Sequence, residues 1–197
     1  VDEWGAWHPE ATSENGLEQE NSVRDAVAAA GVLDDFNHRA DLVSMANIAQ
    51  TVNVLQCVVQ TDEEAAWPTP TYRLFELYRP HVGATALGTT VDTDAVETDL
   101  WDVPLVSASA TAGEDGTYVT LSNRSLDEER TVSIDVDGDI DDVDAEILFA
   151  DHAPEDYSTR ENAAEFESAD LDVSTGGGEA VVELPPNSVA GLSVESA

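Results

Sequence analysis

The sequence predicts an α/β region with parallel strands, followed by an all-β region that forms an antiparallel β-sandwich. Residues 1–85 show long helical periodicity, whereas residues 86–197 show short alternating runs broken by Gly, Asp, Asn and Pro. The charge changes at the same place, from 14 acidic and 4 basic residues in the first region to 28 and 3 in the second. The length of 197 residues allows one large domain or two small ones.

The first region is predicted to run strand, helix, strand, helix, which is the order of parallel α/β folds. Apolar residues recur every three or four positions over 23–38, and Ser22 with Asp25 forms an Asp variant of the capping box, so a helix is expected there. The β-branched segment from Leu42 to Val59 predicts a buried strand. Aromatic and leucine residues over 72–78 predict a second helix, which ends before Pro80.

The second region is predicted to be antiparallel, because its apolar and polar residues alternate as in half-buried strands. Asp115-Gly116 and Asp137-Gly138 are expected to form turns. The expected strands cover residues 103–110, 117–123, 131–137, 144–150, 179–184 and 188–194.

The net charge of −35 excludes two classes of partner, nucleic acids and anionic membranes, because both need a basic protein surface. Two interpretations of the charge compete. A patch for a basic partner would be concentrated in one block, whereas the acidic residues here are spread along the chain and lysine is absent. That distribution favours adaptation to molar salt, where the Debye length is roughly 3 Å and self-repulsion is screened.

Two further features bear on location. The single cysteine, Cys57, excludes an intrachain disulfide and is expected to be a small buried apolar residue. No uncharged apolar stretch reaches the length of a membrane span, and the first residues carry no signal peptide. Because the chain begins inside an expected strand, we expect it to be a fragment, with a cytoplasmic location.

The opening segment Val1–His8 places two acidic residues directly before two tryptophans, Trp4 and Trp7, at the end of the first expected strand. Sugar-processing sites combine these residue types, because apolar sugar faces stack on indole rings while a carboxylate attacks or stabilises an oxocarbenium-like centre. From spacing alone, a surface turn is the competing interpretation.

Several motifs resemble the α-L-arabinofuranosidases of glycoside hydrolase family 51. They are the Asp-Glu-Trp opening, the residues 21–25 and 39–43, the stretch Met45–Gln56 and the segment 69–81, with looser similarity at 121–124 and 184–189. The resemblance implies the C-terminal part of a (β/α)8 TIM barrel followed by an antiparallel β-sandwich domain. Residues 1–85 would be the seventh and eighth βα units of the barrel, and residues 86–197 the sandwich.

The same resemblance assigns site residues. Glu3 matches the catalytic nucleophile at the end of the seventh strand, the face where barrel enzymes place their sites. Trp7 matches an aromatic residue of the sugar subsite, and Gln50 matches a residue that hydrogen-bonds the sugar or the nucleophile. Trp4 and Asn53 are further candidates for substrate binding. The family's acid/base glutamate matches nothing here, so we expect no hydrolysis by this chain alone.

Other motifs point to no cofactor. The acidic run from Asp135 to Glu146 resembles a calcium loop, but its glycine stands at position 4 instead of 6, and an acidic hairpin turn is the alternative. The four histidines are too dispersed to predict a metal site. His8, beside Trp7, is either a neighbour of the sugar subsite or a loop residue.

The leading hypothesis is therefore a retaining glycosidase that releases terminal α-L-arabinofuranosyl groups from arabinan or arabinoxylan. The expected partner is an arabinose-containing oligosaccharide or polysaccharide, and family analogy leaves a homo-oligomer open. Two alternatives remain: an endoglucanase or β-xylosidase of the same clan, and a non-catalytic sandwich module. For the second, five aromatic residues of the sandwich region are expected to serve mostly in packing: Trp101, Tyr118, Phe149, Tyr157 and Phe166.

Overall fold

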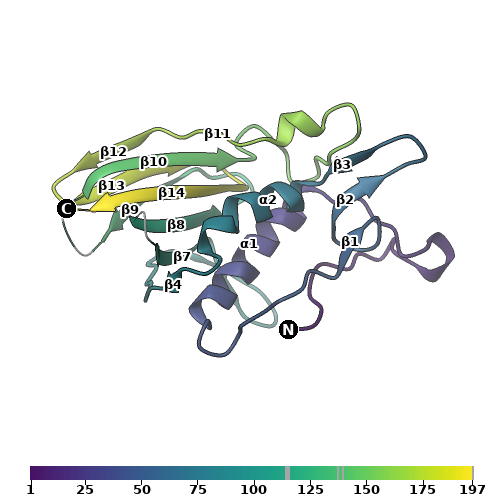
Figure 1. Cartoon of the computed structure of the whole chain (residues 1–197), viewed down its shortest axis with the longest axis horizontal. Helices are drawn as coiled ribbons and strands as arrows, with labels where there is room; N and C mark the ends of the chain where they lie inside the picture. Colours follow the sequence, from purple (N-terminus) through teal and green to yellow (C-terminus); the bar gives the residue numbers. More distant parts are fainter. Residues whose placement is uncertain (114–115, 137, 139, 197) are drawn as a thin grey trace.

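Two helices and a β-sandwich form most of the structure, a computed structural model that describes residues 1–113, 116–136, 138 and 140–196 (Figure 1). The helices are α1 (Val23–His38) and α2 (Pro70–Tyr78), and short 3-10 turns occupy Ser13–Asn15, Arg79–His81 and Ala163–Phe166. The main strands are β7 (Val106–Gly113), β8 (Gly116–Asn123), β9 (Arg130–Asp135), β10 (Ile140–Leu148), β13 (Glu179–Leu184) and β14 (Ser188–Ser196).

These six strands correspond to the six that the alternation predicted, and the sandwich is confirmed. One sheet has the order β11-β10-β14-β8-β7-β4, with β4 (Thr85–Ala86) and β11 (Ala169–Asp170) at its edges. The second sheet has the order β12-β13-β9, where β12 spans Val173–Gly176. Between the sheets lies an apolar core, to which Leu121, Leu184 and Leu192 contribute. All pairs within both sheets are antiparallel.

The helices cover the other face of the six-stranded sheet (Figure 1). Their packing forms a second core, in which Val27 and Ala30 of α1 meet Leu74 and Leu77 of α2 and Val189 of β14. The molecule therefore has three layers, with the larger sheet in the middle.

Both helices begin where their capping residues predict. The carboxylate of Asp25 accepts hydrogen bonds from the main-chain N and the Oγ of Ser22, at 2.8 and 3.0 Å, and so fixes the first turn of α1. Thr69 precedes α2 and its hydroxyl accepts from the main-chain N of Tyr72, with Pro70 at the first helical position. The expected bounds of 23–38, and of an end before Pro80, are confirmed.

A buried carboxylate joins α1 to the sheet. Asp34, 1% exposed, accepts hydrogen bonds from the hydroxyls of Ser107, Ser109, Thr120 and Tyr78, at 2.6 to 3.1 Å. Burial raises the pKa of Asp34, although these four hydroxyls oppose the rise. The apolar periodicity of α1 did not indicate this polar attachment.

Parallel pairing in the first region is limited. Trp4 and Ile48 form a single parallel bridge, and β1 (Gln50–Val52) pairs in parallel with β2 (Cys57–Thr61). β2 then pairs antiparallel with β3 (Ala66–Pro68). Among the described residues this is a three-stranded sheet instead of a closed barrel. The observed class is thus a mostly β region with two helices.

The buried strand expected between Leu42 and Val59 is only partly observed. Cys57 is buried as expected, and burial raises its pKa to about 11. By contrast, Leu42 and Met45 are 75% and 64% exposed, and all three residues of β1 are exposed. The prediction was wrong for this half of the segment, because an apolar sequence shows a capacity for burial and the described residues supply no covering surface there.

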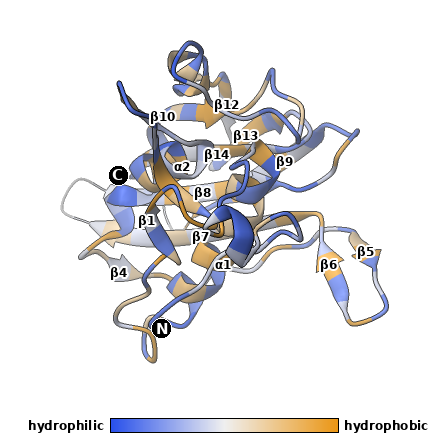
Figure 2. Ribbon diagram, turned by 90° about the vertical axis from the view of Figure 1, so that its right-hand side faces the viewer, coloured by the Kyte–Doolittle hydropathy of each residue, from blue (hydrophilic) through white to orange (hydrophobic). Residues whose placement is uncertain are grey.

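The alternation also missed a hairpin that projects from the sandwich (Figure 2). Its strands are β5 (Ala95–Glu97) and β6 (Asp102–Pro104), and Trp101 on it is 66% exposed. The expected turns at Asp115-Gly116 and Asp137-Gly138 fall partly on residues 115 and 137, outside the described residues. The calcium-like run also includes residues 137 and 139, so its geometry lies outside them as well.

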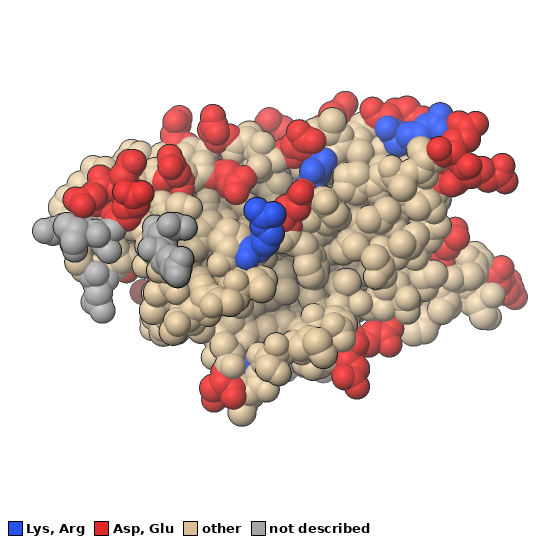
Figure 3. All heavy atoms as spheres, viewed as in Figure 1, with Lys and Arg blue, Asp and Glu red and all other residues tan. Residues whose placement is uncertain are grey.

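Charge is unevenly distributed over the face drawn in Figure 3. Acidic side chains line its upper edge, along β10 to β12 and the loop before β11, while arginine side chains with a few carboxylates stand at its centre, over α2. Of the helices in the described part of the chain, none has the length and apolar character needed to cross a membrane.

Candidate active site

Glu3 lies in the segment that precedes the only parallel bridge to residues 47–49 in the described structure. The main-chain N of Trp4 donates to the carbonyl of Asn47, and the N of Ala49 donates to the carbonyl of Trp4, at 3.2 and 2.7 Å. The Glu3 side chain is exposed. The pairing therefore holds the main chain beside Glu3 and leaves its carboxylate accessible.

Trp7 presents an exposed ring that is fixed at one edge. Its side chain is 64% exposed, and its indole Nε1 donates to the carbonyl of Ala11 at 2.9 Å. The indole is therefore exposed and held at its nitrogen, an arrangement that suits stacking against another molecule. Its location four residues after Glu3 places both groups on one short segment.

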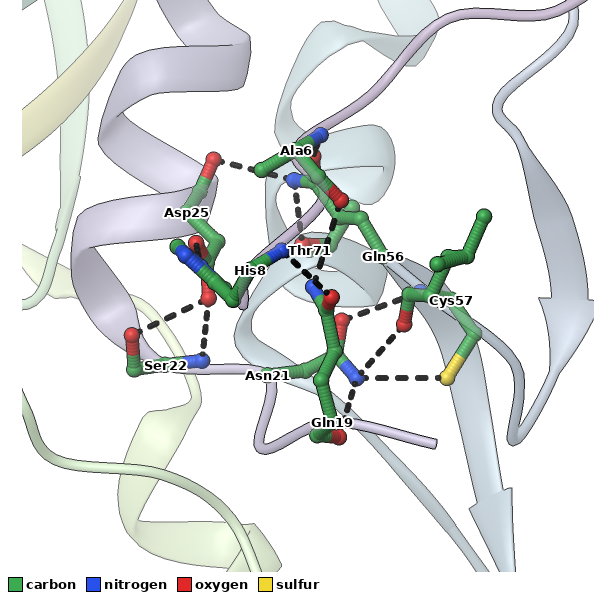
Figure 4. A network of polar contacts seen from close by, with 10 residues as sticks. Ala6, His8, Gln19, Asn21, Ser22, Asp25, Gln56, Cys57 and Thr71 are labelled. Carbon is green, nitrogen blue, oxygen red and sulfur yellow. Dashed lines mark hydrogen bonds and ion pairs between the residues drawn. The ribbon is translucent and has the colours of Figure 1, made fainter. Parts of the chain in front are cut away.

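A buried glutamine fixes the middle of this segment (Figure 4). Gln56 is almost fully buried, and its Oε1 accepts a hydrogen bond from the main-chain N of Ala6 at 2.7 Å. Its Nε2 donates to the carbonyl of Asp25 and to Oγ1 of Thr71, at 2.9 and 3.1 Å. One side chain thus connects the Glu3–His8 segment to the start of both helices.

A second amide holds the same segment from the opposite direction. Gln19 is buried, its Oε1 accepts from the main-chain N of His8 at 3.0 Å and its Nε2 donates to the carbonyl of Ala6 at 3.2 Å. These two contacts lie on either side of Trp7. The main chain that carries the indole is therefore bonded at Ala6 and at His8.

His8 belongs to the same set of hydrogen bonds. Its Nε2 donates to Oδ1 of Asp25 at 2.6 Å, while Oδ2 of the same carboxylate caps α1 through Ser22. Of the two interpretations for His8, the structure favours the loop residue over a ligand. We name Gln19, Asp25, Gln56 and His8 the anchoring network (Figure 4).

The other predicted site residues are placed as follows. Gln50 is exposed at the start of β1, on the chain segment that runs parallel to residues 1–4. Asn53 has φ 62° and uses its amide to bond Thr61, accepting from the main-chain N at 2.7 Å and donating to Oγ1 at 3.0 Å. These contacts close the loop between Asn53 and Thr61, and a role of Asn53 in substrate binding stays a prediction.

Trp4 is partly buried, unlike the exposed Trp7. Its ring packs edge-on against Phe36 at 5.5 Å and stacks with Phe75 at 6.2 Å, and its indole nitrogen is buried. Packing between the helices accounts for this position. A contact between Trp4 and a sugar stays a prediction.

The sequence arguments missed the anchoring network. Gln56 and Asp25 both fall inside the motifs on which the resemblance was based, but their side chains act through hydrogen bonds to distant main chain, which spacing does not show. In the described part of the chain, no group of three His, Cys, Asp or Glu side chains is arranged to hold a metal ion.

Comparison with known proteins supplies a family. Residues 2–188 match the family described as "Alpha-L-arabinofuranosidase C-terminal domain". An intracellular exo-alpha-L-arabinofuranosidase of Bacteroides ovatus is 36% identical over 202 residues, which cover 99% of this chain and 39% of that protein.

Solved structures agree. The GH51 arabinofuranosidase of Xanthomonas axonopodis pv. citri superposes with a TM-score of 0.91 at 36% identity, over 99% of this chain and 40% of that one. An arabinose complex of the α-L-arabinofuranosidase of Thermotoga maritima gives 0.84 at 24% identity, over 97% and 42%, and shows likeness of fold. This chain spans about two fifths of the length of these relatives.

Proposed function

Because this chain belongs to the α-L-arabinofuranosidases of glycoside hydrolase family 51, as their C-terminal region, we propose that the protein releases terminal α-L-arabinofuranosyl groups from arabinan or arabinoxylan oligosaccharides. The observation that carries the proposal is the Glu3–His8 segment. It exposes a carboxylate and an indole four residues apart, while buried amides fix the main chain between and beside them.

In this proposal Glu3 is the nucleophile of a retaining mechanism. Its carboxylate attacks the anomeric carbon, the leaving group departs with a proton from a second carboxyl group, and water then hydrolyses the glycosyl ester. The accessible Glu3 side chain and its rigid main-chain attachment support this role, since a nucleophile must be held close to the reacting carbon.

Trp7 provides the stacking surface for the arabinose ring. Gln50, on the neighbouring parallel segment, donates a hydrogen bond to the sugar or to the Glu3 carboxylate. Trp4 and Asn53 complete the predicted set, with Trp4 acting through packing of the segment. The exposure of Trp7 and Gln50 and the partly buried, packed ring of Trp4 support this division of roles.

The domain division follows from the same proposal. Residues 1–85 are the seventh and eighth βα units of a (β/α)8 barrel, and residues 86–197 are the C-terminal sandwich. The parallel bridge between Trp4 and Ile48, followed in each case by a helix, supports this assignment. The second carboxyl group, roughly 5 Å from the nucleophile in a retaining enzyme, comes from the part of the family that this chain does not span.

Hydrolysis of an aryl α-L-arabinofuranoside tests the proposal. The full-length protein should release the chromogenic phenol, and Glu3→Gln should lower kcat/KM by about a thousandfold or more, because the covalent step is lost. The 197-residue chain alone should release none. Turnover by the chain alone, or an unchanged Glu3→Gln enzyme, would refute the assignment.

We further propose that the protein works at high salt and within the cell. The location rests on the name of the Bacteroides relative, which calls that protein intracellular. The net charge of −35 and the absence of lysine support the salt requirement, because counter-ions screen the mutual repulsion of carboxylates. Unfolding free energy, measured by urea titration, should rise steadily between 0.1 and 2 M NaCl. A flat or falling salt dependence would contradict it.

A further inference from the structure

An open hollow lies next to Gln19, the buried amide that bonds the Glu3–His8 segment. Its volume is about 700 Å³, and it is lined by three parts of the chain: the loop over 10–20, the stretch 53–67 around β2 and β3, and residues 157–159. Asn53 is the only predicted site residue in its described lining, and the other walls come from positions as far apart as Glu10 and Thr159, which no single motif covers.

Two aromatic side chains stand in its wall and are held in place. Trp67 of β3 donates its indole N–H to the carbonyl of Ser158 at 3.2 Å, and the hydroxyl of Ser158 donates to the carbonyl of Pro68 at 2.7 Å. Tyr157 is 39% exposed, and its main chain forms an antiparallel bridge with Ser22. These rings offer fixed apolar faces in a polar setting, as sites for sugar rings do.

The hollow is continuous with the anchoring network. Gln19 lines it, and the same amide bonds Ala6 and His8 on either side of Trp7. A molecule in the hollow therefore lies against the side chain that holds the Trp7 segment. Through this one buried amide the hollow is linked to the segment that carries the proposed sugar site.

The charge of the hollow limits what it can bind. Glu10, Glu18 and Glu20 are exposed at its walls, and the described lining contains no Arg or Lys. An anionic ligand would meet repulsion from all three carboxylates, whereas the hydroxyls of a neutral sugar can donate hydrogen bonds to them.

We propose that this hollow binds an uncharged sugar unit of the chain to which the arabinose is attached, and that it disfavours substrates carrying uronic acids. The inference rests on the proposed function, since it names the remainder of the same substrate. Trp67 and Tyr157 supply the stacking faces. Gln60 lines the wall between them and the network, with its Nε2 bonded to the carbonyl of Gln19 at 3.3 Å.

The test compares two substrates in the full-length enzyme. The ratio of kcat/KM for a neutral arabinoxylo-oligosaccharide to kcat/KM for 4-nitrophenyl α-L-arabinofuranoside should fall about tenfold in Trp67→Ala and in Tyr157→Ala, a change worth about 1.4 kcal/mol. Trp67→Phe, which keeps a ring, should recover most of the ratio. The matched control is Trp101→Ala, an exposed tryptophan on the β5–β6 hairpin, which should leave the ratio unchanged.

Charge is tested with the double variant Glu18→Gln/Glu20→Gln, which should raise kcat/KM several-fold for an oligosaccharide bearing glucuronate and leave the neutral one nearly unchanged. An unaltered ratio in both aromatic variants would overturn the inference, and so would equal losses on both substrates. If the parent enzyme cleaves neither substrate, the proposed function fails. Calorimetric titration of the protein with xylotetraose then tests sugar binding in the hollow independently of hydrolysis. Binding heat that disappears in Trp67→Ala supports the inference, and the absence of binding heat in the parent protein overturns it.

Discussion

Helix α1 carries two buried carboxylates that hold different parts of the molecule. Asp25, in its first turn, bonds His8 and the helix start, and so belongs to the network behind the Glu3–His8 segment. Asp34, toward the other end, bonds only hydroxyls, three of them on the sandwich strands. An aspartate therefore positions a proposed catalytic segment at one end of α1, and another aspartate attaches the β-sandwich near the other end.

The difference lies in the partners. Main-chain and imidazole N–H groups bond Asp25, so loss of its carboxylate frees a loop whose conformation matters for chemistry. Hydroxyls surround Asp34, and three of them belong to the sandwich strands β7 and β8, so loss of this carboxylate weakens the attachment of α1 to the sheet. We therefore expect the Asp34 site to control stability and the Asp25 site to control activity.

The largest expected effect on stability comes from Asp34→Ala. Removing the shared acceptor leaves several buried hydroxyls short of a partner, which should cost roughly 3 kcal/mol of unfolding free energy in urea titrations. Asp35→Ala, its exposed neighbour, is the control and should change stability by less than about 0.5 kcal/mol. If Asp34→Ala instead lowers kcat/KM of the folded full-length enzyme, the division between the two sites is wrong.

The sandwich attachment should also be sensitive to acid through His81. This ring is buried, its nitrogens lie 2.9 and 3.1 Å from the hydroxyls of Thr111 and Thr120, and burial lowers its pKa to about 4. Between pH 6.5 and 4 the unfolded chain binds a proton that the folded chain refuses, so unfolding free energy should fall as pH falls, by at most roughly 3 kcal/mol.

The variant His81→Gln isolates that contribution. Asp34 acts in the opposite sense, because its raised pKa lets the folded chain take up a proton before the unfolded chain does. Subtracting the pH profile of His81→Gln from that of the parent removes the Asp34 and surface carboxylate contributions. Parallel profiles for the two proteins between pH 6.5 and 4 would show that His81 is not the cause.

The Asp25 end should behave differently. Asp25→Ala removes the cap of α1 and the partner of His8, at a cost of about 2 kcal/mol in unfolding free energy. In the full-length enzyme it should also lower kcat/KM for the aryl arabinofuranoside about tenfold or more, because the Trp7 segment loses the contact that fixes the His8 side chain. Asp25→Asn keeps one acceptor, and its kcat/KM should lie between the values of the parent and of Asp25→Ala. Full activity in Asp25→Ala would remove the positioning role.

The smallest changes delete one hydroxyl from each site. Ser22→Ala and Ser107→Ala each remove one hydrogen bond to a carboxylate and should each cost about 1 kcal/mol or less. Only Ser22→Ala should also affect kcat/KM, and then by less than Asp25→Ala does. Equal losses of kcat/KM in Ser22→Ala and Ser107→Ala would show that the Asp25 and Asp34 sites do not differ in this way.

Elements with strong periodic signals were predictable. Helix α1, α2 and the six main strands followed from apolar spacing and caps, because each element's own sequence carries those signals. The burial expected for Phe149 and Phe166 is confirmed, whereas Trp101 and Tyr157 are exposed where packing was expected. Strand β1 was expected to be buried, but its faces depend on surfaces that its own sequence does not encode.

The site was predictable only through its motifs. Glu3 and Trp7 stand in a recognisable opening, yet nothing in their spacing shows that Gln56, some fifty residues later, fixes the main chain between them. Asp34 was hidden for the same reason, since its partners on β7 and β8 lie far along the chain. Long-range polar contacts of this kind leave no periodic trace in a sequence.

Covalent labelling identifies the catalytic nucleophile directly. The full-length enzyme is treated with a fluorinated arabinofuranosyl donor that forms a slowly hydrolysed glycosyl ester, then digested, and the peptide masses are determined. One sugar adduct is expected, located on the carboxylate of Glu3 and absent from Glu3→Gln. An adduct on any other residue, or its persistence in Glu3→Gln, would show that Glu3 is not the nucleophile.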